Sequence, residues 1–160
     1  MPAAFTESRS REGDRMKGSD QEANKAVIRR FVEEFQNQNR VDAIDELVSR
    51  DFVNHSGTVR DVPGMELATD FEGMKGIDRM WRQAFPKQRV TIRDMAAEAD
   101  KVWTHKTFET VHEGEFMGIA PTGKTIAVDA IDIMRVKDGK IVEHWAVQDM
   151  WGLMRQLGAV

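Results

Sequence analysis

Histidine and aspartate residues recur within apolar, β-branched runs in the C-terminal half of the chain. Residues 101–149 contain three of the four histidines, His105, His112 and His144, together with Asp132. Apolar and polar residues alternate through this stretch, which predicts strands with one covered face. Imidazole and carboxylate groups that project from a sheet into a covered space can transfer protons. The stretch therefore predicts one wall of a reactive pocket.

Asp132 occupies an otherwise apolar row. In the strand predicted over residues 124–136 it shares a face with Ile126, Val128, Ala130 and Met134. Burial disfavours the ionised carboxylate, so the pKa of Asp132 is expected to rise unless a cation pairs with it. A raised pKa would make Asp132 a general acid or base near neutral pH. A structural aspartate paired with a histidine or an arginine is an equally good interpretation.

Further candidates surround Asp132 in the sequence. His144 shares a face of the last predicted strand with Gln148, and His112 ends an earlier strand. Asp149 lies at the end of the last strand, where it could either cap the following segment or turn into the cavity. A catalytic role requires His112, Asp132 and His144 to open onto one cavity. The candidates for binding a substrate or lining the pocket are Asn54, His55, Trp81, Trp103, Phe116, Met134 and Ala146.

Composition excludes several classes of protein. The 160 residues suit one domain, and the net charge of −4 provides no basic surface for nucleic acid or a membrane. The chain has no cysteine, which removes thiolate catalysis, and no tyrosine, which removes a phenolic proton donor. The histidines have neither HxxxH nor HxH spacing, so no metal site and no cofactor are predicted. No signal segment is evident, and a cytoplasmic location is the default expectation.

The segment GIAPTGKT at residues 118–125 matches the phosphate-binding pattern GxxxxGK[ST]. That pattern binds phosphate only when a helix follows it and directs backbone N–H groups at the ligand. Here the following residues, IAVDAIDIMRV, predict a strand, and Pro121 removes one of the N–H groups. The segment is therefore predicted to be a loop between strands and not a nucleotide site.

The elements that must position these residues follow a simple order. Residues 1–18 predict a disordered tail, followed by one domain over residues 19–160. Helical periodicity predicts helices beginning at Ser19 or Asp20, over residues 41–48 and over residues 74–85. Residues 58–73 predict a loop, which either covers the pocket as a lid or packs onto the core. Strands are predicted at 52–55, 89–99, 101–112, 124–136 and 140–149, which defines an α+β fold.

Several of these segments together resemble the SnoaL-like polyketide cyclases, or ester cyclases, of the nuclear-transport-factor-2-like superfamily. The resemblance covers residues 22–158 and is based on FVNH at 52–55, HEGEFMG and PTGK within 112–124, and IDIMRVKDGKIVEHW at 131–145. It implies a cone-shaped, curved antiparallel sheet wrapped around the N-terminal helices and a deep apolar pocket. It also implies a homodimer, or a higher oligomer, that packs through the outer face of the sheet.

The resemblance also has implications for the site. The well-studied cyclases place their general base, an aspartate, at the position of Ala146, and a histidine at the position of Asp132. Asn54, His112 and His144 match the family. The leading hypothesis is cofactor-independent acid–base chemistry on a small apolar carbonyl or polyketide-like compound, with Asp132 transferring a proton. The alternatives are a hydrolase or hydratase, in which Asp132 and Asp149 activate water, and a non-catalytic binder of a hydrophobic molecule.

Overall fold

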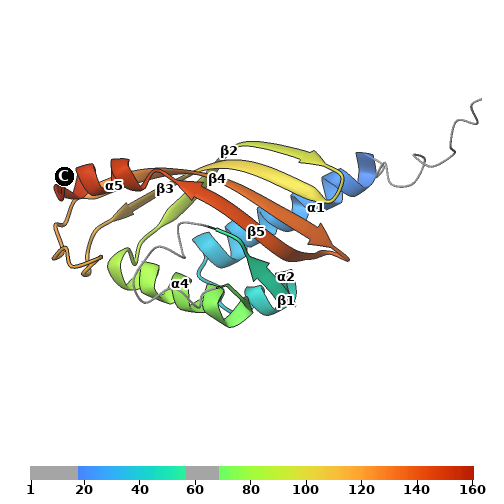
Figure 1. Ribbon diagram of the computed structural model, residues 1–160, viewed down its shortest axis with the longest axis horizontal. Helices are drawn as coiled ribbons and strands as arrows, with labels where there is room; N and C mark the ends of the chain where they lie inside the picture. Colours follow the sequence, from blue (N-terminus) through green and yellow to red (C-terminus); the bar gives the residue numbers. More distant parts are fainter. Residues whose placement is uncertain (1–17, 57–68) are drawn as a thin grey trace, which may run out of the picture.

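The computed structural model describes residues 18–56 and 69–160. The predicted N-terminal tail up to residue 17, and residues 58–68 of the predicted loop or lid, lie outside this part of the chain. Figure 1 shows a long, twisted sheet with helices α1, α2 and α4 beneath one of its faces and α5 at one end. This arrangement confirms the predicted α+β class.

The sheet has five strands in the order β1-β5-β4-β3-β2. Their bounds are Val48–Asn54, Arg89–Glu98, Lys101–Val111, Thr125–Lys137 and Lys140–Gln148 for β1 to β5. Strands β2 to β5 form the antiparallel meander that the alternating pattern predicts. The early extended piece differs from the expected antiparallel sheet, because β1 pairs in parallel with β5. This pairing sets Asn54 opposite His144.

The first helix changes its winding along its length. The α-helix α1 (Gly18–Arg30) continues as the π-helical segment η1 (Phe31–Asn37). The apolar stripe predicted for this helix is buried at Ile28, Phe31, Val32 and Phe35. At the end of η1, the side chain of Asn37 accepts a hydrogen bond from Val90 N–H and donates one to Val90 C=O. These two hydrogen bonds therefore connect the C-terminal end of η1 to the edge strand β2.

The shorter helices have identifiable ends. Helix α2 covers only Ala43–Leu47, because β1 begins directly at Val48. Helix α4 (Phe71–Ala84) begins three residues earlier than predicted, because Asp70 accepts a hydrogen bond from Gly73 N–H and caps it. Helix α5 (Met150–Leu157) ends at Gly158, whose φ of 85° suits glycine. None of the helices in the described ranges is long and apolar enough to cross a membrane.

The buried face of the sheet meets two groups of apolar side chains. One group combines α1, α2 and β1 with Val102 and Met134, and the other packs Phe85, Phe108 and Phe116 against α5. Residues 112–124 link β3 to β4, and Thr125 begins a strand and not a helix. The GIAPTGKT segment is thus a connection between strands, as predicted. The two apolar groups leave a cavity between them.

Candidate active site

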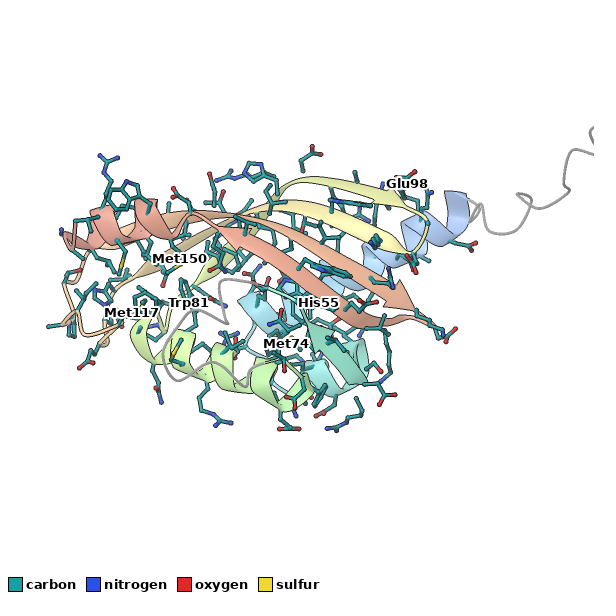
Figure 2. The ribbon with its side chains drawn as sticks, viewed as in Figure 1. His55, Met74, Trp81, Glu98, Met117 and Met150 are labelled. Atoms are coloured by element: carbon teal, nitrogen blue, oxygen red, sulfur yellow. The ribbon has the colours of Figure 1, made fainter. Side chains whose placement is uncertain are left out.

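A cavity of about 170 Å³ lies between the inner face of the sheet and the helices. Most of its lining is apolar and rich in aromatic and methionine side chains, and Figure 2 shows Met74, Trp81, Met117 and Met150 along the space between the sheet and α4. The apolar lining residues are Phe31, Phe35, Phe52, Met74, Ile77, Met80, Trp81, Phe108, Phe116, Met117, Met134, Ile141, Ala146 and Met150. Methionine side chains adapt to irregular ligands, so this lining suits an apolar body with rings.

Polar side chains gather on one part of the wall. They include Asn54, Asp132 and His144, which come from β1, β4 and β5 respectively. His144 Nε2 lies 2.9 Å from Asp132 Oδ1, and His144 Nδ1 lies 3.2 Å from Asn54 Oδ1. The parallel pairing of β1 with β5 places Asn54 beside His144. Three of the predicted site residues therefore form one hydrogen-bonded row inside an apolar cavity.

Lys106 was not among the predicted site residues, yet it also lines the cavity. Its ammonium group forms an ion pair with Asp132 Oδ2 and donates a hydrogen bond to Gln36 Oε1 at 3.4 Å. The side chain of Lys106 is only 1% exposed. A signal for it does exist in the sequence, because Lys106 is in phase with Val102 and Phe108 on the covered face of its strand.

This ion pair decides the charge of Asp132. Burial raises the pKa of Asp132, but the Lys106 ammonium and the hydrogen bond from His144 outweigh it and hold the pKa well below its usual value. Asp132 is therefore ionised at neutral pH. The expectation that Asp132 titrates near neutral pH as an acid or base is wrong, because a cation pairs with it in the interior.

The hydrogen bonds of His144 fix the orientation of its ring. Asn54 Oδ1 accepts a hydrogen bond from Ser56 N–H at 3.0 Å, which fixes the oxygen, and not the nitrogen, of the amide toward this corner. Both ring nitrogens of His144 consequently face oxygen acceptors. A neutral imidazole donates through one ring nitrogen and an imidazolium through both. The two contacts hold the ring of His144 in one orientation in the wall of the cavity.

Four other predicted candidates, Trp81, Phe116, Met134 and Ala146, line the same cavity, whereas His112 does not. Trp81 and Phe116 pack edge to face, with ring centroids 5.7 Å apart. His112 is fully buried but absent from the lining, because it lies farther along the strand against Phe85. Its Nδ1 accepts a hydrogen bond from Thr122 N–H at 3.2 Å and so supports the loop. The expectation that His112 opens onto the cavity with Asp132 and His144 is therefore wrong.

Three further candidates lie away from the cavity lining. His55 stacks on Trp145 with ring centroids 4.6 Å apart, and its Nε2 lies 2.8 Å from Glu143 Oε2. Trp103 is out of phase with Lys106 along β3, so it belongs to the opposite face. Asp149 is exposed and accepts a hydrogen bond from Gly152 N–H at 2.8 Å as the cap of α5. Of the two alternatives open for Asp149, the structure has the cap.

Residues 18–56 and 69–160 contain no group of three or more His, Asp or Glu side chains placed to hold a metal ion. The side chains that line the cavity include an ionised carboxylate, an ammonium, an imidazole and amide groups. Such a set can move a proton and stabilise negative charge on oxygen.

A curved sheet that encloses helices and an apolar cavity is the architecture of the nuclear-transport-factor-2-like superfamily. The model of the SnoaL-like polyketide cyclases matches residues 26–157, and the chain belongs to this family. The aklanonic acid methyl ester cyclase AcmA of Streptomyces galilaeus is 28% identical over 83% of this chain and 89% of its own. The nogalonic acid methyl ester cyclase of Streptomyces nogalater is 25% identical over 76% of this chain and 88% of its own.

Solved structures agree with this assignment. IdmH of Streptomyces antibioticus, for which a polyketide cyclase activity has been suggested, has a TM-score of 0.74 at 33% identity over 84% of this chain and 98% of its own. AclR of Streptomyces galilaeus has a TM-score of 0.75 at 29% identity over 88% of this chain and 87% of its own. For AclR a hydroxylase activity has been suggested. The family thus fixes the fold and supports cyclase-type function, while the site must define the reaction.

Proposed function

We propose that this protein is a cofactor-independent cyclase that closes a carbon–carbon bond within an apolar, polyketide-like carbonyl compound. The observation that carries the proposal is the row of Asp132, His144 and Asn54 in an aromatic and methionine-rich cavity. In this row His144 is the group that moves the proton. Asp132 and Asn54 are positioning residues that hold its ring.

The reaction is an intramolecular aldol closure. Neutral His144 donates its Nε2–H to Asp132, and its Nδ1 exchanges the 3.2 Å contact with Asn54 Oδ1 for the substrate. Nδ1 then removes a proton from a carbon that is flanked by carbonyl groups, so the C–H bond breaks and an enolate forms. The enolate carbon attacks a second carbonyl, a carbon–carbon bond forms, and the electron pair of that C=O bond moves to its oxygen. The imidazolium returns the proton to this oxygen, so substrate and product are isomers. While the enolate exists the ring is an imidazolium, and the oxygens of Asp132 and Asn54 then face its two N–H groups.

The register of the sheet supports this division of roles. Asp132 on β4 is the direct partner of Ala146 on β5. A carboxylate at position 132 therefore lies one strand away from the position at which the family resemblance places a general base. A strongly lowered pKa makes Asp132 a weak base but a permanent counterion for the imidazolium. We therefore assign the proton transfer to His144 and not to Asp132.

A hydrolase or hydratase mechanism has less support. It would use Asp132 and Asp149 together to activate a water molecule. Asp149 caps α5 and does not line the cavity, so the second carboxylate is missing from the site. A binder without catalysis would not need a buried row of charged and hydrogen-bonding groups, which costs stability to bury. The cyclase is the hypothesis that gives a role to each of Asp132, His144 and Asn54.

The test is conversion of aklanonic acid methyl ester and nogalonic acid methyl ester, the compounds in the names of two relatives. We expect the wild-type protein to form an isomer of unchanged mass that separates by chromatography. His144→Gln should lower the rate by about 100-fold or more, the usual size of a proton-transfer contribution. Asp149→Ala and His105→Gln, both outside the cavity lining, should keep the rate.

Two results would contradict the proposal. A product heavier by one water would support the hydrolase alternative. Tight binding of both esters without any conversion would support the binder.

We also propose that the protein is a homodimer that packs through the outer face of its sheet. Ile131 on β4 and Val147 on β5 are direct partners and are 48% and 73% exposed. Together with Val53 on β1 they place apolar side chains on the face opposite the cavity. A second copy of the chain is the occupant that the family resemblance implies for this face.

A further inference from the structure

Lys106 is a buried cation in the wall of the cavity. Lysine is among the residues least often buried, and here its side chain is 1% exposed. An ammonium group has three N–H donors. Within the described part of the chain, its oxygen partners are the Asp132 carboxylate and Gln36 Oε1. One donor of this cavity-lining ammonium has no such oxygen partner. Its neighbour is the ring of Phe108, whose centroid lies 5.3 Å from Nζ, so this donor can turn to an oxygen of a ligand in the cavity.

The acids around the cavity are paired with cations, and Lys106 is the cation of this set that lines the cavity. The titratable side chains in the lining are Asp78, Lys106, Asp132 and His144. Asp78 Oδ2 lies 2.8 Å from Arg82 Nε, so this acid is neutralised by its own partner. Asp132 contacts both Lys106 and His144. The buried ammonium of Lys106 in an apolar wall is complementary to an anionic oxygen of a ligand.

We infer that Lys106 is a further substrate-binding residue, which holds an ionised oxygen of the ligand, and that the cavity therefore selects ring-bearing compounds with an acidic, ionisable oxygen. Enolates of 1,3-dicarbonyl groups and phenolates of ring systems belong to this class. The inference rests on the proposed function, because it names the group that stabilises the enolate oxygen while His144 carries the proton. A preorganised cation at a developing oxyanion acts without solvent reorganisation.

The inference has a consequence that does not depend on turnover. A hydroxyl group beside Lys106 must ionise at a lower pH in the cavity than in water, since the cation favours the anion. Alizarin, a dihydroxyanthraquinone dye, changes colour when its hydroxyl group ionises, and its ring system suits the aromatic and methionine lining. The visible spectrum of alizarin, titrated with pH at saturating protein, measures this shift directly.

We expect the ionisation of bound alizarin to move down by about one pH unit or more relative to the free dye. Lys106→Met should abolish the downward shift, while Lys106→Arg should keep most of it because the charge remains. Lys101→Met is the matched control, since Lys101 lies on the same strand but is absent from the cavity lining. Where Lys106→Met fails to fold, Lys106→Met/Asp132→Asn removes both members of the pair and should also lose the shift.

Three outcomes would overturn the inference: no binding of alizarin, an unshifted or raised ionisation in the wild-type protein, or an equal downward shift in Lys106→Met. The dye experiment and the cyclisation assay fail independently. A downward shift that depends on Lys106, without conversion of either ester, would keep the inference and defeat the cyclase. Conversion of an ester without a Lys106-dependent shift of the dye would support the cyclase and overturn the inference.

Discussion

Asp132, His144 and Lys106 form one network of contacts in the wall of the cavity. The carboxylate of Asp132 is buried, and it contacts the ammonium of Lys106 through one oxygen and the ring of His144 through the other. Removing one member of a buried ion pair leaves the other charged and unpaired, which is costly. The three side chains therefore act as one unit, and single substitutions in it affect stability as well as activity.

Asp132→Asn should lower the free energy of unfolding by about 3 kcal/mol at pH 7, because it leaves Lys106 buried without its counterion. The pKa of Asp132 is lower in the folded state than its ordinary value of about 3.9 in the unfolded chain. Its contribution is therefore complete above the unfolded pKa and is lost as the pH falls toward the folded pKa. Urea denaturation of both proteins at pH 7 and at about pH 3 measures this difference.

The difference between wild type and Asp132→Asn should become smaller at the lower pH. Asp129→Asn is a suitable control, because Asp129 lies on the exposed side of the same strand. It should lower the free energy of unfolding by roughly 1 kcal/mol or less at both pH values. A deficit of Asp132→Asn that stays constant with pH would show that Asp132 gains no stability from ionisation.

The sequence identifies Asp132 but not its cation. Asp132 is an acid in an apolar row, and the period of a strand is enough to predict its burial. Its partner Lys106 lies on the neighbouring strand, where Lys106 pairs with Ala130 and Thr104 pairs with Asp132. The loop between the strands does not determine this register from the sequence alone. From the sequence alone, the pKa of Asp132 could be either raised by burial or lowered by a cation. The pairing of β3 with β4 decides between the two, because it brings Lys106 to Asp132.

At the scale of elements, the phase along a strand decides which predicted residues reach the cavity. His144 and Ala146 are in phase on β5 and both line it, whereas His55 continues from β1 out of phase with Asn54. His112 is in phase with the cavity-facing residues of β3, but it lies beyond the end of the strand and packs against Phe85 instead of lining the cavity. The alternating pattern gives the face of a residue. It does not give its distance from the cavity along the strand.

Two further elements were harder to predict for physical reasons. The parallel pairing of β1 with β5 joins segments about ninety residues apart, and no local pattern specifies it. The π-helical winding of η1 does not change the apolar stripe, so the sequence predicts only a helix there. Both features contribute to the site, since β1 supplies Asn54 and η1 supplies Phe31, Phe35 and Gln36.

At the scale of the whole molecule, the sheet separates a reactive face from an associating face. If a second copy packs on the outer face, Val147→Lys should convert the dimer to a monomer, because it places a charge within the apolar contact. Val41→Lys is the matched control, since Val41 is 51% exposed but lies outside the sheet. Light scattering coupled to size-exclusion chromatography measures the molecular mass. A monomeric wild-type protein would contradict the proposed dimer.

The central claim is that His144 moves the proton while Asp132 and Asn54 position its ring. The most direct test is chemical rescue of His144→Ala with a series of imidazoles of different basicity. The account predicts that added imidazole restores conversion of the methyl ester, with a rate that depends on the basicity of the imidazole. The same additions should leave Asp132→Asn unchanged, because that variant still has its ring. A His144→Ala protein that converts the ester at the wild-type rate without imidazole would contradict the claim.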